Sequence, residues 1–211
     1  ATQVVDEARH VEVFAKYGNE KLGGTLPFNW HIQSLVDDTI SDSRWDITYL
    51  GMQIMVEGLG LGSMAYLREL TKEPLLKQLL RNVMTDEARH ISFGVITLKE
   101  VYAQMTDAEI MERQEFAYEA SVKVGERVLQ QEVYEKMGVK TKDIAPFLLN
   151  DPAQAWIRKM LAAKIIPNVS KLGLLDRNGA WLRKKFEESG TIEFEHLGES
   201  DEEFAAWVHT F

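Results

Sequence analysis

The chain has 211 residues, carries 33 acidic against 24 basic side chains for a formal net charge of −9, and contains no cysteine. This length can bury one sizeable core, so we expect a single domain over residues 1–211. The acidic balance argues against nucleic acid and membranes as partners, because both attract clustered Lys and Arg. Without cysteine, any metal must be held by oxygen and imidazole ligands. An acidic pair, Asp6 and Glu7, stands where a secretory leader would be basic and apolar, which predicts a cytoplasmic protein.

Apolar residues recur at three- and four-residue spacing along most of the chain, which predicts an all-α protein. A first helix is expected to reach about Tyr17, and a short second one to span about 32–40. Ser and Asp in the stretch SDSRWD offer N-caps for a long helix over about 43–70. Pro74 suits the first turn of a further helix, which is expected to end near Met105.

The second half of the chain is also predicted to be helical. Thr106 or Asp107 caps a fifth helix that is expected to end near Gly138. The stretch APFLLNDPAQ reads as a link, followed by a helix interrupted at Pro167, a shorter helix over about 180–188 and an acidic tail. These late helices are expected to close a bundle or to contact a second subunit, and a homodimer is the expected assembly.

The pentapeptide DEARH occurs twice, once near the start of the chain and once in its middle. On a helix, Glu7 and His10 share one face, and so do Glu87 and His90. One such Glu-x-x-His pair is uninformative, because these pairs are common on helix surfaces. Both copies, however, stand among apolar residues: Val4, Val5, Val11, Val13 and Phe14 at the first, and Val83, Met84, Ile91 and Phe93 at the second. Buried carboxylates are normally paired or bound to a metal, so the pattern favours a metal site over surface decoration.

A third acid lies in the run LGMQIMVEGLGLGSMAYL, whose only strongly polar side chains are Gln53 and Glu57. The run is long enough to cross a membrane, but a charge would then lie at its middle, so a core helix is favoured. Helical bundles neutralise such acids with two metal ions, held by a Glu from each of two helices and a Glu-x-x-His pair from each of two others. Glu57 and the two DEARH motifs provide five of these six ligands, and the sixth is expected from a helix preceding Glu7.

These motifs resemble the ferritin-like di-iron carboxylate proteins, and the DEARH pair is similar to the DExRH motifs of bacterial multicomponent monooxygenase hydroxylases. The run from DSRWDITYLGMQIMVEGLG to LLRNVMTDEARHISFGV also looks like ferritin-like oxygenases distantly related to p-aminobenzoate N-oxygenases and ribonucleotide reductase small subunits. The resemblance implies a ferritin-like helical bundle that lacks its first helix, with metal-binding helices over 1–105 and additional packing helices and an acidic tail over 106–211. It also implies two iron ions, with manganese or a mixed pair as alternatives, bound by Glu7, His10, Glu57, Glu87 and His90.

The resemblance assigns roles to the residues beside these ligands. In the resembling hydroxylases, the Asp before each ligand Glu holds the His of the opposite helix, so Asp6 is expected to hold His90 and Asp86 to hold His10. The cations that would offset these Asp charges are Arg9 and Arg89. The alternative is a set of ordinary interhelical salt bridges.

A substrate pocket is expected on the metal-facing side of the Glu57 helix. Gln53 and Tyr49 lie about one and two turns before Glu57, so they share its face, and Gln53 can bond a ligand carboxylate or the substrate. Glycines 58, 60 and 62 each cost roughly 1 kcal/mol in a helix, which indicates either close helix packing or a cavity. The cavity is the preferred interpretation, and its expected lining is Tyr49, Met52, Gly58, Leu61 and Phe93.

The predicted function is oxidation by a dinuclear non-haem iron centre that uses O₂ to hydroxylate, N-oxygenate or desaturate a small organic substrate. Electrons must come from an external donor, because the chain has no GxGxxG fingerprint for a flavin or nicotinamide. Two alternatives stay open, namely a ferroxidase that handles iron and a non-catalytic bundle with an incomplete metal site. The other histidines, His31, His196 and His209, have no partner at ligand spacing and are expected to be peripheral.

Overall fold

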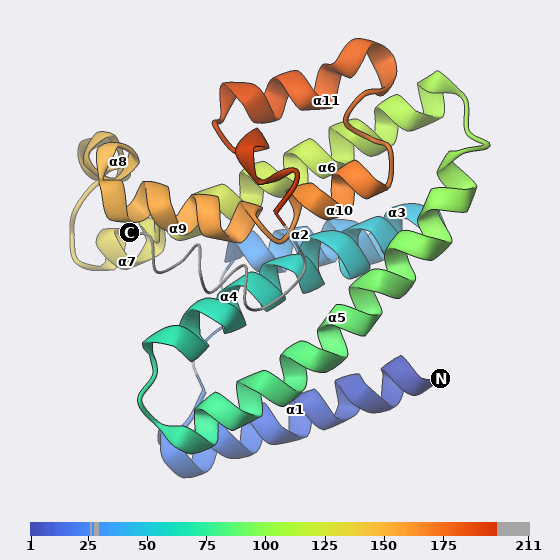
Figure 1. Ribbon diagram of the computed structural model, residues 1–211. Coiled ribbons are helices and arrows are strands. Elements are labelled where there is room, and N and C mark those ends of the chain that lie inside the picture. Colours follow the sequence, from blue (N-terminus) through green and yellow to red (C-terminus); the bar gives the residue numbers. More distant parts are fainter. Residues whose placement is uncertain (26, 28–29, 198–211) are drawn as a thin grey trace.

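The computed structural model describes residues 1–25, 27 and 30–197, and this part of the chain is helical without a β-strand (Figure 1). The all-α prediction is therefore confirmed for the described residues. None of their helices combines the length and hydropathy that crossing a membrane requires. The elements are α1 (Thr2–Lys21), α2 (Trp30–Ser41), α3 (Trp45–Tyr49), the π-helix η1 (Leu50–Val56), α4 (Glu57–Leu70), α5 (Pro74–Tyr102), α6 (Asp107–Val128), α7 (Gln131–Lys136), α8 (Thr141–Asn150), α9 (Pro152–Ala162), α10 (Ile166–Lys171), α11 (Arg177–Glu188) and the 3₁₀-helix η2 (Ile192–Phe194).

The helices pack in successive layers. Helices α1 and α5 run side by side along one side of the molecule, and α5 packs against α4 and η1. Helix α2 and η1 then contact α6, which in turn packs against α9 and α11. Figure 1 shows α11 on the side of α6 that faces away from α1. Helix α1 therefore has far less cover than η1 and α4, which lie in the middle of the molecule.

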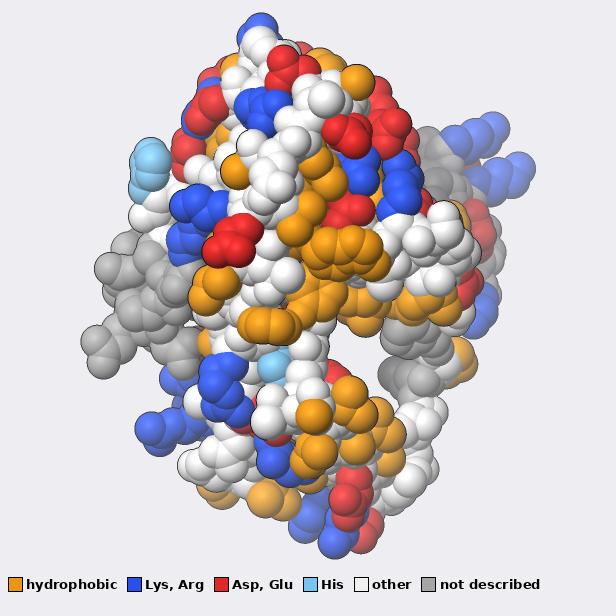
Figure 2. Space-filling view, turned by 90° about the vertical axis from the view of Figure 1, so that its right-hand side faces the viewer, with side chains coloured by type: hydrophobic (Ala, Val, Ile, Leu, Met, Phe, Trp, Pro, Cys, Tyr) orange, Lys and Arg blue, Asp and Glu red, His pale blue; other side chains and the backbone are white. Residues whose placement is uncertain are grey.

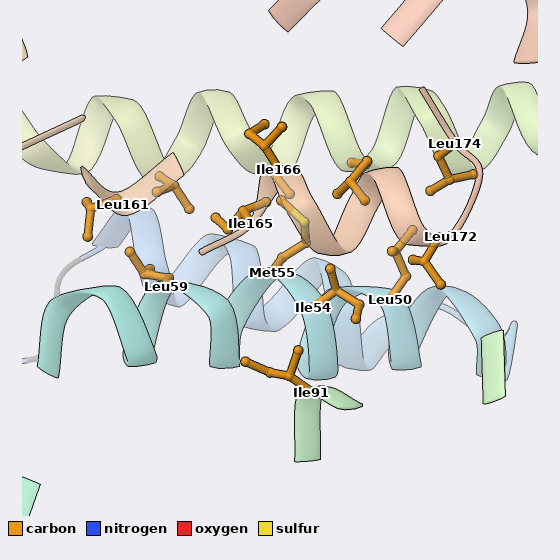
Figure 3. Close-up of a cluster of buried hydrophobic side chains, with 14 of the residues drawn as sticks. Leu50, Ile54, Met55, Leu59, Ile91, Leu161, Ile165, Ile166, Leu172 and Leu174 are labelled. Atoms are coloured by element: carbon orange, nitrogen blue, oxygen red, sulfur yellow. The ribbon is translucent and has the colours of Figure 1, made fainter. Parts of the chain in front are cut away.

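The main core lies between the η1–α4 segment and the helices of the second half. Leu50, Ile54 and Met55 of η1 are fully buried, and Figure 3 shows Met55 beside Ile165 and Ile166, at the turn that joins α9 to α10, and Leu50 beside Leu172. Their partners there include Ile165 and Ile166, which are also buried. Burying each such side chain stabilises the fold by roughly 1.5–3 kcal/mol relative to exposing it. This packing fixes the helix that carries Glu57.

Two helices begin where the sequence predicted, at Pro74 and after Thr106. Helix α5 begins at Pro74, and the side chain of Glu73 accepts a hydrogen bond from the backbone N–H of Leu75 (3.1 Å). Helix α6 begins after Thr106, which forms a capping box with Glu109. Both starts satisfy backbone N–H groups that the first helical turn leaves unpaired.

The helix predicted over 43–70 has a different start and an irregular middle. This helix begins at Trp45, and no Ser or Asp side chain caps its first turn. Asp42 instead accepts a hydrogen bond from the backbone N–H of Arg44, the residue before the helix (2.8 Å). Residues 50–56 are π-helical, which places the irregular backbone directly before Glu57. π-helical segments are rare and often lie at functional sites. The 3.6-residue apolar pattern did not predict this segment.

Two buried contacts hold η1 in position. Arg113 of α6 forms a fork with Asp46 of α3, with Nε 2.8 Å from Oδ2 and Nη2 3.0 Å from Oδ1. Gly51 lies so close to α2 that a Cβ there would stand 2.5 Å from Thr39 Cγ2. Only a residue without a side chain fits at this contact, so Gly51 permits α2 to approach η1.

The second half departs from the sequence prediction at three places. Helix α6 ends at Val128 rather than near Gly138, because Gln130 adopts a left-handed φ of 47° that breaks the helix. The predicted link APFLLNDPAQ is largely helical, since it contains most of α8, with Pro146 inside the helix, and the start of α9. The interruption at Pro167 is confirmed in part: α9 ends at Ala162 and Pro167 lies in the first turn of α10.

Candidate metal centre

The five predicted ligands come from three helices and converge. Helix α1 contributes Glu7 and His10, helix α5 contributes Glu87 and His90, and helix α4 begins with Glu57. One ligand atom from each of Glu7, Glu57, Glu87 and His90 lies within 4.8 Å of the others. This group can hold a metal ion.

Both histidines turn the same ring atom toward the acids. His90 Nδ1 is 3.1 Å from both Glu7 Oε1 and Glu87 Oε2. His10 Nδ1 is 3.2 Å from Glu87 Oε1 and 3.5 Å from Glu7 Oε2. His10 stands outside the tight group of four, but its Nδ1 faces the same carboxylates. The two motifs therefore present their imidazoles to a shared centre.

The other ring nitrogen of each histidine is bonded across the helix pair. His10 Nε2 is 3.2 Å from Asp86 Oδ2, and His90 Nε2 is 3.2 Å from Asp6 Oδ2. These are the two crossed pairs that the family resemblance implies. An aspartate that accepts a hydrogen bond from Nε2–H keeps the proton on Nε2 and leaves Nδ1 unprotonated, which is the form that binds a metal. That the pairs support metal ligands stays a prediction.

Two arginines surround the crossed pairs. Arg9 Nη2 lies 2.8 Å from Asp6 Oδ1 and 2.6 Å from Asp86 Oδ2, while Arg89 Nη2 lies 2.5 Å from Asp86 Oδ1. Burial alone would raise the pKa of Asp86, but bonds from His10, Arg9 and Arg89 outweigh it and lower this pKa to about 2. The bond from His90 is the main cause that lowers the pKa of Asp6. Both aspartates therefore stay ionised at neutral pH.

The pKa of Glu57 shows that the carboxylates of the site repel one another. Burial, followed by the charges of Glu87 and Glu7, raises the pKa of Glu57 to about 9. Burial and the charge of Glu7 also raise the pKa of Glu87. Within the described residues, Glu57 Oε2 and Glu7 Oε1 are buried atoms without a hydrogen-bond donor. Unpaired carboxylate oxygens in such a place cost free energy, and a divalent cation would remove that cost.

Gln3 belongs to this site, although the sequence analysis missed it. Its Nε2 donates to Glu57 Oε1 (2.8 Å) and to Gln53 Oε1 (3.1 Å). Gln53 was predicted to bond a ligand carboxylate or the substrate, and Gln3 links the Gln53 amide oxygen to the Glu57 carboxylate. The signal was present in the sequence, because Gln3 precedes Glu7 by four residues and so shares its helix face.

An opening of about 930 Å³ leads to these ligands from outside. Its lining includes Gln3, Glu7 and His90 from the site, together with Tyr49 and Phe93, whose rings meet edge to face at 6.1 Å. Burial and the charge of Glu57 raise the pKa of the Tyr49 phenol. Figure 2 shows a hollow with hydrophobic side chains at its rim, between the lower part of the molecule and the larger body above it. Tyr49 and Phe93 thus line the opening that leads to the ligands.

The predicted cavity beside the glycines of α4 is wrong. A Cβ on Gly58 would lie 3.2 Å from Ile165 Cγ1, and one on Gly62 would lie 3.6 Å from Leu161 Cδ2. Gly58 therefore serves close helix packing, whereas Gly62 lies at ordinary contact distance from α9. Leu61 lines a separate hollow of about 50 Å³ behind the ligands, and Met52 does not line the opening at Tyr49.

The first DEARH motif is only partly buried, because His10 is 5% exposed whereas the apolar residues beside it are not covered as expected. Val4, Val5 and Val11 of α1 are exposed at 72%, 64% and 71%, because within the described residues α1 packs mainly against α5. The side chain of Glu7 is 47% exposed, compared with 11% for Glu87. The centre therefore has a covered side at α4 and α5 and an open side at α1.

The three remaining histidines differ from one another. His31 is buried beside the ring of Trp30, and its Nδ1 lies 3.6 Å from Glu126 Oε2, so its predicted peripheral position is wrong. The side chain of His196 is 91% exposed, as predicted. His209 lies outside the described residues.

We compared the chain with protein-family models, with curated proteins and with solved structures, and found no match in any of the three. Its function is therefore inferred from the geometry of its own residues.

Proposed function

We propose that this protein is a ferritin-like, dinuclear non-haem iron oxidoreductase that uses O₂ to oxidise a small organic molecule. The observation that carries the proposal is the convergence of Glu57 with both DEARH motifs on one centre, where buried carboxylate oxygens have no donor among the described residues. Carboxylate and imidazole ligands with open positions suit ferrous iron or manganese, including a mixed pair. The donor set also matches the arrangement of helical bundles that hold two ions, apart from one carboxylate.

The position for the sixth ligand is proposed to be the open side beside Glu7. Three carboxylates, Glu7, Glu57 and Glu87, already meet there, and Glu7 is the one that is half exposed. A carboxylate brought to this opening by another segment or by a second copy of the chain would complete the set. The exposed apolar residues Val4 and Val11 of α1 would then gain a cover. A homodimer is one assembly that provides it.

Iron bound here would supply the electrons for the reduction of O₂, and an external donor would restore them. The protein's own part is to hold ligands and protons in place. Asp6 accepts a hydrogen bond from Nε2–H of His90, and Asp86 accepts one from Nε2–H of His10. The protons stay on Nε2, and both unprotonated Nδ1 atoms face the centre. Gln3 donates to Glu57 and fixes the orientation of its carboxylate. Tyr49 and Phe93 provide an aromatic wall against which a substrate can be positioned.

Ferroxidase activity is the second candidate, because the half-exposed Glu7 gives hydrated ferrous ions a direct path to the site. Gel filtration separates the two candidates, since an iron-storage protein is expected to form a large cage. A third outcome is a non-catalytic bundle. Less than about one iron per chain after reconstitution would support it, since a complete site of this bundle type holds two ions.

The direct test is anaerobic reconstitution with ferrous iron, followed by measurement of bound iron and of O₂ consumption. We expect iron to bind and Glu57→Ala to abolish both binding and O₂ consumption. Glu12→Ala is the matched control, because Glu12 is an exposed acid of α1. Retention of iron and O₂ consumption in Glu57→Ala would show that the centre lies elsewhere.

A further inference from the structure

A second cavity lies away from the DEARH motifs, in the half of the molecule without a predicted role. It has a volume of about 260 Å³ and lies between α6, α9 and the end of α11. None of the five proposed metal ligands lines it. Its wall residues Leu161 and Ile165 face Gly62 and Gly58 of α4 on their other side. A layer of packed side chains therefore separates this cavity from Glu57, and it is a different site from the opening at Tyr49.

Small residues create the cavity. A Cβ built on Gly125 of α6 meets no atom within 4 Å, so this face of the helix borders open space. Ala155 and Ala162 of α9 also line the cavity. A glycine within a helix costs roughly 1 kcal/mol relative to alanine, and protein interiors are otherwise closely packed. An empty space that costs free energy to maintain between packed helices indicates that a ligand binds there.

The floor of the cavity is apolar and belongs to the buried core. Leu161, Ile166 and Phe186 are each at most 3% exposed and belong to the main hydrophobic core. Figure 3 shows Leu161 and Ile166 in the layer between α4 and α6. Such a floor favours an apolar ligand body, because binding would remove apolar surface from water on both sides.

The edge of the cavity is cationic. Arg158 and Lys159 line it, and none of its lining residues in the described part of the chain is acidic, although the chain as a whole carries an acidic excess. Lys159 Nζ pairs with Glu193 Oε1 at 2.7 Å. Arg158 Nη2 donates to the backbone oxygen of Leu149 (3.2 Å), whereas its Nη1 is buried and has no acceptor among the described residues. A buried guanidinium nitrogen without an acceptor is costly, and an anionic ligand group would satisfy it.

We propose that this cavity binds a small, mostly apolar carboxylate, with its anionic group at Arg158 and its apolar part against Leu161 and Phe186. A volume of 260 Å³ equals roughly nine water-sized volumes of ~30 Å³, so the ligand has about nine or ten heavy atoms. Medium-chain fatty acids and small aromatic acids fall in this class. The site does not depend on the proposed function, because it shares no residue with the metal centre.

Isothermal titration of the full chain with octanoate and with octan-1-ol tests the proposal. Octanoate is expected to bind one per chain, and octanol at least about tenfold more weakly, because it lacks the charge that pairs with Arg158. Arg158→Gln should lower octanoate affinity to the level of octanol. Arg81→Gln is the matched control, because Arg81 is an exposed cation of α5 remote from the cavity. Equal binding of acid and alcohol by the native chain would overturn the anionic assignment.

A second experiment tests the proposal with variants that fill the cavity. Gly125→Leu should abolish octanoate binding, whereas Gly125→Ala should retain it, because only leucine projects far into the cavity. Circular dichroism establishes that each variant is folded, and Ala155→Met fills the cavity from α9 should Gly125→Leu not fold. Unchanged octanoate affinity in a folded variant with a filled cavity would place the bound octanoate elsewhere and overturn the proposal.

Discussion

The two copies of DEARH have the same sequence and the same crossed pairing, yet they occupy different environments. Both histidines contact the Asp of the opposite motif at 3.2 Å. In α5 the motif is covered, with Val83 4% exposed, whereas in α1 Val4 is 72% exposed. The comparison shows that a pentapeptide determines which side chains share a helix face, while the neighbouring helices determine how deeply that face is buried.

The largest effect is expected at Glu57, the acid that both motifs face. Its folded-state pKa of about 9 lies above the ordinary carboxyl value of 4.5, so the metal-free folded chain holds a proton that the unfolded chain releases. Stability from this source is present below pH 4.5 and is lost as pH rises toward 9. Glu57→Gln should therefore flatten the pH dependence and make the metal-free chain more stable than the native one at pH 8. Urea unfolding with a chelator at pH 5, 7 and 9 measures this, and parallel profiles for the two proteins would contradict it.

The next prediction compares the loss of metal affinity when the ligand Glu is removed from each motif in turn. Glu87→Ala is expected to lower metal affinity by more than about 100-fold, because the resulting gap lies in a covered place and leaves charges unpaired. Glu7→Ala should cause a smaller loss, since water can replace a side chain that is 47% exposed. Competition with a chelator of known affinity gives both values. An equal or larger loss in Glu7→Ala would show that exposure does not separate the two copies.

The next prediction compares Asp6 and Asp86, the aspartates of the two motifs, in their effect on metal affinity. Asp86 bonds His10, Arg9 and Arg89, whereas Asp6 bonds His90 and Arg9. Replacing a residue that supports a metal ligand typically lowers metal affinity about 10–100-fold. We expect Asp86→Asn at the upper end of that range and Asp6→Asn at the lower end, by the same chelator assay. The opposite order would mean that the extra bonds to Asp86 do not support the ligand.

The smallest effects concern the apolar flanks. Val83→Ala should destabilise the metal-free monomer by ~2 kcal/mol, because it leaves a cavity in a packed core. Val4→Ala should change stability by less than about 0.5 kcal/mol, since the side chain is exposed within the chain. Urea unfolding at several protein concentrations gives both values. A cost at Val4 that grows with protein concentration would reveal a second copy covering α1.

The positions of the proposed ligands on their helices were predicted more completely than the cover over those helices, for a physical reason. Glu7, His10, Glu87 and His90 are placed by local helical spacing, which is visible in the sequence. The exposure of Val4 depends on which helix covers α1, and no local pattern contains that information. Gly58 and Gly62 were misassigned for the same reason, because close packing and a cavity require the same residue until the partner, here Ile165 or Leu161, is known.

Backbone irregularities were the least predictable feature. Gln130, which ends α6, has a positive φ, and glutamine is not a residue type that predicts one. The seven π-helical residues of η1 are apolar or small apart from Gln53, so their pattern fits an α-helix equally well. By contrast, Pro74 acts through its fixed φ and missing N–H and Thr106 through a capping hydrogen bond; both are local properties, and both helix starts were predicted from them.

The π-helix has a consequence for how this chain tolerates insertions and deletions. A π-helical turn holds roughly one residue more than an α-helical turn, so η1 stores spare chain length between the Asp46 anchor and Glu57. Loss of one residue within 50–56 can be absorbed by tightening this turn, which leaves α3 and α4 in place. The same loss within α5 has no such reserve and would swing His90 by about 100° around the helix axis. Length variation among natural relatives of this chain is therefore expected to fall in η1 and to be absent between the N-terminus of α5 and its DEARH motif.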